Sequence, residues 1–133
     1  RPFQILVYSS DSGVREAVKA SMGASLGAGM PAHKFTEVAT GDALRLMIDE
    51  KRRFDLYILD AEATPEGGMA LSRELKDEVY ECSPTLLIAG RASDGWLATW
   101  SRADGVVLHP IDPFTLAAEA KKLLSAHTVL QSR

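Results

Sequence analysis

The sequence is poor in the features that mark several classes of protein. Its 133 residues include a single cysteine, Cys82, which cannot form an internal disulfide and has no neighbouring residues to complete a metal site. A reducing cytoplasm is therefore the expected compartment. No apolar run approaches the roughly 20 residues that a membrane-spanning helix needs, so we predict no membrane span.

The sequence also has no large excess of positive or negative charge. The chain has 15 Lys and Arg residues against 18 Asp and Glu residues, which gives a formal net charge of -3. Nucleic acids and anionic membranes bind to concentrated basic surfaces, and we expect neither as a partner. The one basic cluster, Lys51-Arg52-Arg53, falls at the end of a predicted helix, where cations interact favourably with the helix dipole.

A catalytic constellation is missing as well. The three histidines, His33, His109 and His127, are scattered and lack the spacing of metal ligands. Ser9 and Ser10 are the only candidates for an acyl nucleophile, and no strained Gly-x-Ser-x-Gly turn surrounds them. We therefore expect a binding module rather than an enzyme, without a resident cofactor.

What the sequence does contain is an alternation of strand and helix patterns. Five short apolar runs are separated by segments with apolar residues at helical spacing, such as Val14, Val18 and Met22. Most of these runs are continuous, which is typical of parallel strands covered on both faces. The runs are Phe3 to Tyr8, Phe35 to Ala39, Leu56 to Leu59, Thr85 to Ala89 and Val106 to Leu108.

This alternation predicts an α/β fold with a doubly wound, five-stranded parallel sheet, for which 2-1-3-4-5 is a common strand order. We expect one domain over residues 1–127 and a C-terminal tail at residues 128–133. In this order ligands gather at the carboxyl ends of strands 1 and 3. Ser9, Ser10 and Asp60 therefore mark the expected site.

Local signals add detail to this fold. Asp11, Thr40 and Asp112 stand where a side chain would cap the first turn of a helix. The connector from Gly23 to Lys34 is long for such a fold and contains three glycines and a proline. We predict a flexible surface loop there, with a binding loop as the alternative.

Three segments together resemble the receiver domain of the response-regulator family. Leu56 to Asp60, with the Pro/Gly-containing loop that follows, is similar to the family's third strand and phosphoacceptor aspartate. Leu86 to Gly90 is similar to the fourth strand. Gly105 to Pro110 is similar to the fifth, which ends in a lysine and a cis-proline in the family. The resemblance runs from Ile5 to about Leu124 and implies a flavodoxin-like fold, a role in two-component signalling and a cis bond before Pro110.

A finer resemblance is to atypical stand-alone receivers of actinobacteria. It rests on the segment Glu62 to Pro65 and on the segment Trp96 to Arg102. Such a resemblance implies a receiver whose site departs from the common pattern.

Several positions do depart from it. Phosphoryl transfer to a carboxylate needs magnesium and a further cation to neutralise charge. Family members supply two acids where this sequence has Ser9 and Ser10, and a lysine where it has His109. Ala89 replaces a residue with a hydroxyl, and Val106 replaces an aromatic residue. The resemblance therefore implies weak magnesium binding at most.

Two other acids stand near the expected site. We expect Asp11 to cap a helix and Glu62 to be a solvated loop carboxylate, with an inward bend of Glu62 towards a metal as the alternative. Without paired acids, Asp60 is free to accept hydrogen bonds from the neighbouring serine pair or from His109. We hypothesise a contact between Asp60 and His109 in place of the family's aspartate–lysine pair, which would favour the charged imidazole.

Trp96 and Trp100 are four residues apart and so share one helix face. Both could pack inwards, but an exposed tryptophan commonly anchors an interface. In the family the face made by the fourth helix, fifth strand and fifth helix contacts protein partners or a second copy. We expect the same face to bind a protein here, either a histidine kinase or a second copy of the chain.

The leading interpretation is an atypical receiver that acts as a signalling and protein-interaction module, independent of ordinary magnesium-dependent phosphorylation. The alternative is a genuine phosphoacceptor that a partner histidine kinase modifies at Asp60. A remote alternative is a flavodoxin-like flavin carrier. That reading rests on the hydroxyl-rich turn from Tyr8 to Gly13, which could hold a phosphate group at a helix start.

Overall fold

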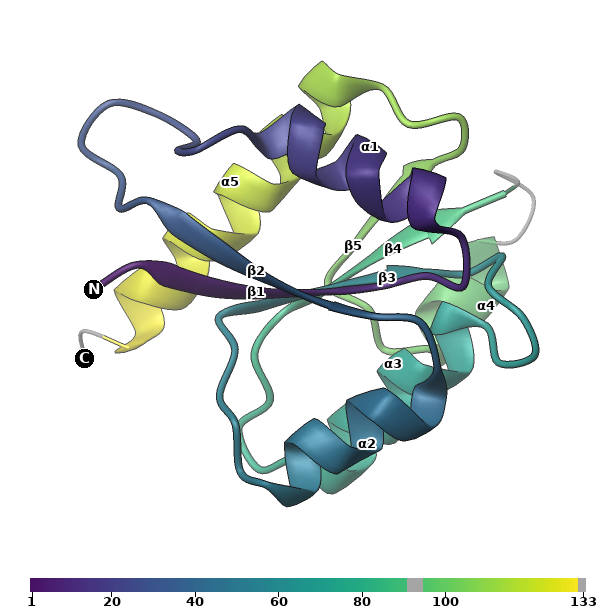
Figure 1. The fold of residues 1–133 in the computed structure, drawn as a ribbon. Coiled ribbons are helices and arrows are strands. Elements are labelled where there is room, and N and C mark those ends of the chain that lie inside the picture. The colour runs from purple at the N-terminus through teal and green to yellow at the C-terminus, as the bar shows by residue number, and fades with distance from the viewer. Residues whose placement is uncertain (91–94, 132–133) are drawn as a thin grey trace.

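A computed structural model of the chain describes residues 1–90 and 95–131, in which five strands alternate with five helices (Figure 1). The elements are β1 (Phe3–Tyr8), α1 (Ser12–Met22), β2 (His33–Val38), α2 (Gly41–Asp49), β3 (Leu56–Asp60), α3 (Gly68–Glu78), β4 (Thr85–Ala89), α4 (Gly95–Trp100), β5 (Gly105–Leu108) and α5 (Pro113–Gln131).

The five strands form one parallel sheet in the order β2-β1-β3-β4-β5. This confirms the predicted α/β class and strand order. Helices α1 and α5 cover one face of the sheet, and α2, α3 and α4 lie on the other (Figure 1).

Each face of the sheet has its own apolar core. Ile5 and Val7 of β1 pack with residues of α1 and α5, whereas Leu6 and Tyr8 pack with residues of α2 and α3. Adjacent strand residues point to opposite faces, so a strand covered on both faces needs apolar residues at successive positions. All five residues of β3 and all five of β4 are buried, which explains the continuous apolar runs.

Several boundaries differ from the predicted ones; β3 and β5 are each one residue longer than the predicted run, and β2 ends one residue earlier. Strand β2 begins at His33 rather than Phe35, because His33 pairs with Phe3 at the start of β1. Helix α5 continues to Gln131, so residues 128–131 of the expected C-terminal tail are helical; residues 132–133 lie outside the described part. Helix α2 ends at Asp49, which leaves the basic cluster beyond its last turn.

Side chains at the carboxyl edge of the sheet start the helices as predicted. The Asp11 carboxylate accepts a hydrogen bond from the Gly13 amide, and Asp112 accepts from the amide of Phe114. The Thr40 hydroxyl accepts from the amide of Ala43. Each cap satisfies an amide that has no partner within its helix, and the Asp11 cap fixes the chain direction just after β1.

Candidate functional site

The predicted site residues come together at the carboxyl edge of the sheet. Asp60 is the last residue of β3, Ser9 follows β1, and His109 follows β5. The His109 amide donates to the carbonyl of Ala89 at 2.8 Å, which continues the pairing of β5 with β4 and holds His109 beside the strand ends. The peptide bond between His109 and Pro110 is cis, as the resemblance implied.

The carboxylate of Asp60 is buried and accepts three hydrogen bonds. Its Oδ2 atom accepts from the Ser9 hydroxyl at 2.8 Å. Its Oδ1 atom accepts from the Glu62 amide and from His109 Nε2, both at 2.9 Å. The Asp60 residue is only 3% exposed, so these donors replace the water that an ionised carboxylate otherwise needs.

These contacts decide two of the hypotheses made for Asp60. The contact with His109 is confirmed, and Ser9 is confirmed as a donor. Ser10 is exposed and instead accepts a hydrogen bond from the Thr64 amide at 3.1 Å, so it supports the loop after Asp60 rather than the carboxylate.

Ser9 has a fixed role because every polar atom around it is engaged. It is fully buried, and its hydroxyl oxygen accepts from the Asp11 amide at 3.0 Å while the hydroxyl proton goes to Asp60. Its carbonyl accepts from the Arg15 guanidinium at 2.6 Å. Ser9 therefore serves as a neutral donor at the position where the family has an acid.

Glu62 contributes to the site through its backbone amide. Its side chain is exposed, yet its carboxylate lies over the backbone just past β4, since a Cβ atom on Gly90 would be 1.5 Å from Glu62 Oε1. The side chain thus crosses the edge of the sheet. Ala89 is buried and offers no hydrogen-bonding side chain.

The loop after Asp60 is held close to the strand by glycine. A Cβ atom on Gly68 would lie 2.8 Å from the carbonyl carbon of Leu59 and 2.9 Å from that of Asp60. Helix α3 can therefore begin against the end of β3 only if this position has no side chain. Gly68 is the second of two adjacent glycines in the sequence, and this close approach is the physical reason for glycine at that position.

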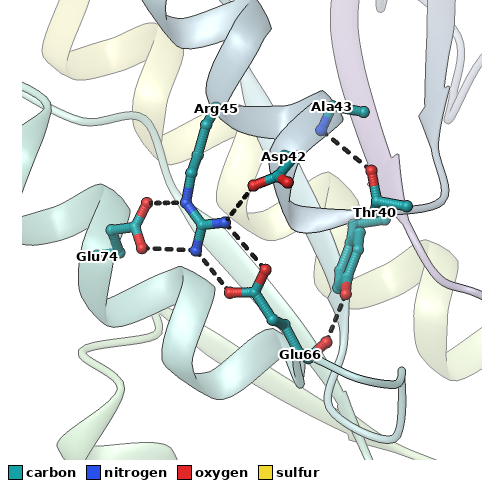
Figure 2. A network of polar contacts seen from close by, with 7 residues as sticks. Thr40, Asp42, Ala43, Arg45, Glu66 and Glu74 are labelled. Carbon is teal, nitrogen blue, oxygen red and sulfur yellow. Dashed lines mark hydrogen bonds and ion pairs between the residues drawn. The ribbon is translucent and has the colours of Figure 1, made fainter.

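Sequence reasoning missed a charged network that anchors the same loop to α2 and α3 (Figure 2). The Arg45 guanidinium of α2 donates to Glu66 in the loop at 2.5 and 2.9 Å and to Glu74 of α3 at 2.8 and 2.9 Å. It also pairs with Asp42 at 3.1 Å. The Tyr8 hydroxyl donates to the Glu66 carbonyl.

The network is also visible in the electrostatics. Hydrogen bonds from Arg45 hold the pKa of the Glu66 carboxyl below its usual range. Hydrogen bonds to Glu66 and Glu74 in turn raise the pKa of the Arg45 guanidinium above its usual value. Positions 45, 66 and 74 are far apart in the sequence and share no local pattern, so nothing in the sequence alone pointed to them.

The donor set does not fit a bound magnesium ion. Magnesium prefers an octahedron of hard oxygens, chiefly carboxylates and water. Here both oxygens of Asp60 already accept hydrogen bonds from protein groups, and Ser9 donates where an acid would coordinate. Within residues 1–90 and 95–131, no group of three or more His, Cys, Asp or Glu side chains is arranged to hold a metal ion.

A second feature is a set of exposed large apolar residues on α4, β5 and the start of α5, which we call the α4–β5–α5 surface. Trp96 is 70% exposed and Trp100 is 46% exposed, so neither is packed into the core. The Arg73 guanidinium lies 5.6 Å from the centre of the Trp100 ring. The other exposed members are Val106, Leu108 and Phe114.

A helix long and apolar enough to traverse a bilayer is not found among the helices of the described residues.

The long connector that starts at Gly23 ends where β2 begins, at His33. Its residues Leu26 and Met30 are partly buried and pack against the core on the side of the sheet that α1 and α5 cover.

No family model matches the chain. Two strains of Mycobacterium tuberculosis each have an uncharacterized response regulatory protein that is 45% identical to it over 123 residues, which is 92% of this chain and 92% of the relative.

Solved structures give the same answer for the fold. The receiver domain of a signal transduction histidine kinase from Syntrophus aciditrophicus has a TM-score of 0.75 and 25% identity, covering 93% of this chain and 91% of its own. The chemotaxis response regulator CheY4 of Vibrio cholerae has a TM-score of 0.74 and 20% identity, over 92% and 99%. A CheY-like receiver domain protein of Methanospirillum hungatei has a TM-score of 0.77 and 18% identity, over 96% and 98%.

Proposed function

The chain belongs to the response-regulator family and folds as a receiver domain of two-component signalling, and from this premise we propose that it acts as a protein-interaction module without magnesium-dependent phosphorylation of Asp60. The proposal concerns how the receiver works, since an ordinary receiver is switched by phosphorylation of its aspartate.

The main support for the proposal is that the Asp60 carboxylate is buried and that both of its oxygens already accept hydrogen bonds. An attacking carboxylate must present an oxygen to the incoming phosphoryl group, and a metal must offset the repulsion between the two anions. In this site both oxygens are engaged by Ser9, His109 and the Glu62 amide, and the residue is 3% exposed. Attack by Asp60 would require breaking these bonds inside the protein.

We also propose that the chain needs no resident cofactor and has no enzyme activity of its own. Magnesium is expected to bind weakly at most. The reason is the substitution of Ser9 and Ser10 for paired acids, because a neutral hydroxyl is a weak ligand for magnesium. We also expect it to act in the cytoplasm.

The partner in this proposal is a protein that binds the α4–β5–α5 surface. Exposed aromatic side chains are effective anchors of interfaces, and this surface has three of them, Trp96, Trp100 and Phe114. A histidine kinase and a second copy of the chain are the two candidates.

The test is to add magnesium and beryllofluoride, a mimic of the phosphoryl group, to the purified protein. We expect no change in backbone amide chemical shifts around Asp60 and no gain in thermal stability. The matched control is the double variant Ser9→Asp with Ser10→Asp, which restores the acid pair. We expect this variant to be less stable without metal, because the acids repel Asp60.

Magnesium should reverse the loss in the double variant. At 100 times its dissociation constant, a ligand that binds only the folded state stabilises it by about 2.7 kcal/mol. A shift of the wild-type spectrum with magnesium and beryllofluoride that disappears in Asp60→Asn would contradict the proposal and establish the ordinary phosphoacceptor instead.

A further inference from the structure

The hydrogen bond between His109 and Asp60 determines which nitrogen of the imidazole carries a lone pair. The Asp60 carboxylate is an acceptor, since it also receives bonds from Ser9 and from the Glu62 amide. His109 Nε2 must therefore donate to it, and in the neutral imidazole the lone pair lies on Nδ1. Within residues 1–90 and 95–131, no group forms a hydrogen bond with Nδ1.

The two groups differ in access. The side chain of His109 is 23% exposed, whereas the side chain of Asp60 is 4% exposed. Both lie at the carboxyl edge of the sheet. The imidazole is therefore the more accessible of the two groups to a molecule in solvent.

The two groups also differ in what they require for phosphoryl transfer. A carboxylate and a phosphoryl group are both anionic, and their repulsion is large unless cations intervene. A neutral imidazole has no such repulsion. The positive charge that develops on its ring during attack is stabilised by a carboxylate bound to the opposite nitrogen, as in other nucleophile and base pairs.

Three substitutions relative to the family, at Ser9, Ser10 and His109, are together consistent with one change of phosphoacceptor. Ser9 and Ser10 remove the acids that would hold a metal, and His109 supplies a nucleophile that does not need the metal. Asp60 then serves to orient the imidazole and to balance its charge.

We propose that His109, rather than Asp60, is the phosphoacceptor of this site, and that its Nδ1 atom takes a phosphoryl group from an N-phosphorylated donor without a metal ion. The donor class includes a phosphohistidine of a partner protein and, as a small-molecule probe, phosphoramidate. This inference rests on the proposed function, because it requires an Asp60 that does not itself react.

The step balances without an additional reactant. The Nδ1 lone pair of His109 forms the new N–P bond while the N–P bond of the donor breaks. The donor reacts with its nitrogen protonated and that nitrogen keeps the electron pair, so phosphoramidate releases neutral ammonia and a donor phosphohistidine releases a neutral imidazole. The His109 ring keeps its Nε2 proton, which stays hydrogen-bonded to Asp60.

The test is to incubate the purified protein with phosphoramidate in the presence of EDTA and to measure its intact mass. We expect the gain of one phosphoryl group that is lost in acid but survives alkali, as the N–P bond of a phosphohistidine does and an acyl phosphate does not. Peptide fragmentation of the wild-type protein should locate the group on His109, which keeps the test decisive even if a variant fails to fold.

Variants separate the roles of the two residues. His109→Gln should abolish the modification. Asp60→Asn retains an oxygen that accepts from Nε2 but lacks the charge, and should slow the modification by roughly 10- to 100-fold. The matched control is His127→Gln, because His127 lies 3.7 Å from the carboxylate of Asp55 and its side chain is 12% exposed. This variant should react like the wild type.

The contrary outcomes are distinct. No mass gain, or a gain that persists in His109→Gln, overturns the inference and leaves the proposed function standing. An alkali-sensitive phosphate that requires magnesium and disappears in Asp60→Asn overturns the proposed function as well.

Discussion

His109 Nε2 lies 2.9 Å from Asp60 Oδ1, although β4 separates their strands in the sheet. The contact therefore crosses the edge of the sheet from the end of β5 to the end of β3. Strand β4 ends in Ala89, whose methyl group cannot compete for the carboxylate. Through this contact, the position of the β5 end is tied to the state of Asp60.

Ser9→Ala tests the internal support of Asp60. The variant removes a buried donor and leaves one carboxylate oxygen without its partner, which should destabilise the fold by about 1–3 kcal/mol. Urea denaturation followed by circular dichroism measures this change. The matched control is Ser10→Ala, which should change stability by less than about 0.5 kcal/mol, because the position is exposed and water can replace the hydrogen bond with the Thr64 amide. Equal effects for the two serines would contradict the role given to Ser9.

Gly68→Ala tests the close approach of α3 to β3. The added Cβ atom would lie 2.8 Å from the backbone of Leu59, and backbone atoms cannot move aside as a flexible side chain can. We expect a loss of about 1–3 kcal/mol in the free energy of unfolding, measured by chemical denaturation. The comparison variant is Gly27→Ala, whose Cβ atom would meet the ends of two flexible side chains, Lys121 at 3.1 Å and Met30 at 3.9 Å. A larger loss in Gly27→Ala than in Gly68→Ala would refute this account.

Arg45→Gln tests the network of Figure 2 through its dependence on pH. Because Arg45 lowers the pKa of the Glu66 carboxyl in the folded state, the pair stabilises the fold above the ordinary glutamate pKa of about 4.3. That contribution is lost as the pH falls through the lowered, folded-state value. The melting temperature of Arg45→Gln should therefore fall below that of the wild type at neutral pH.

The difference in melting temperature should narrow as the solution is acidified and as salt is added. Lys34→Gln is the control, since it removes one positive charge from an exposed position of β2. Its melting temperature should stay near that of the wild type at every pH. A difference for Arg45→Gln that grows in acid would have the wrong sign for this mechanism.

Trp100→Ala tests the α4–β5–α5 surface. Truncation of an aromatic anchor commonly costs 2 kcal/mol or more of binding energy, so association should weaken by roughly 30-fold. Sedimentation velocity over a range of protein concentrations measures self-association, and the same variant is used in binding assays with a candidate kinase. Tyr80→Ala is the control, because Tyr80 is also an exposed aromatic residue but lies beyond the end of α3. Loss of association in both variants would argue against a specific surface.

Much of the fold was predictable because its signals are local. Strands β1 and β4 begin and end where the apolar runs do, since both faces of those strands are buried. The caps at Asp11 and Asp112 depend only on residues within the next helical turn. The end of α5 was not predictable in this way, because the residues after His127 carry no Gly or Pro and can continue a helix as readily as leave it.

The site was predictable only in part. The contact of His109 with Asp60 could be predicted from the resemblance. The different roles of Ser9 and Ser10 could not, because the sequence does not show that Ser9 is buried and Ser10 is exposed. Arg45 and Glu66 could not be paired from the sequence, since their contact depends on how the loop after β3 meets α2.

The division of the apolar core into two layers has a consequence for genetic compensation. Ile58 and Leu59 are neighbours in β3, yet Ile58 packs with Val18 and Leu116 on one side of the sheet and Leu59 packs with Leu44 and Leu71 on the other. A smaller side chain at either position would create a cavity in one layer of the core only, and a larger side chain would create a steric clash in that same layer. Suppressor mutations selected for a defect at Ile58 should therefore arise in α1 or α5, and those selected for a defect at Leu59 should arise in α2 or α3.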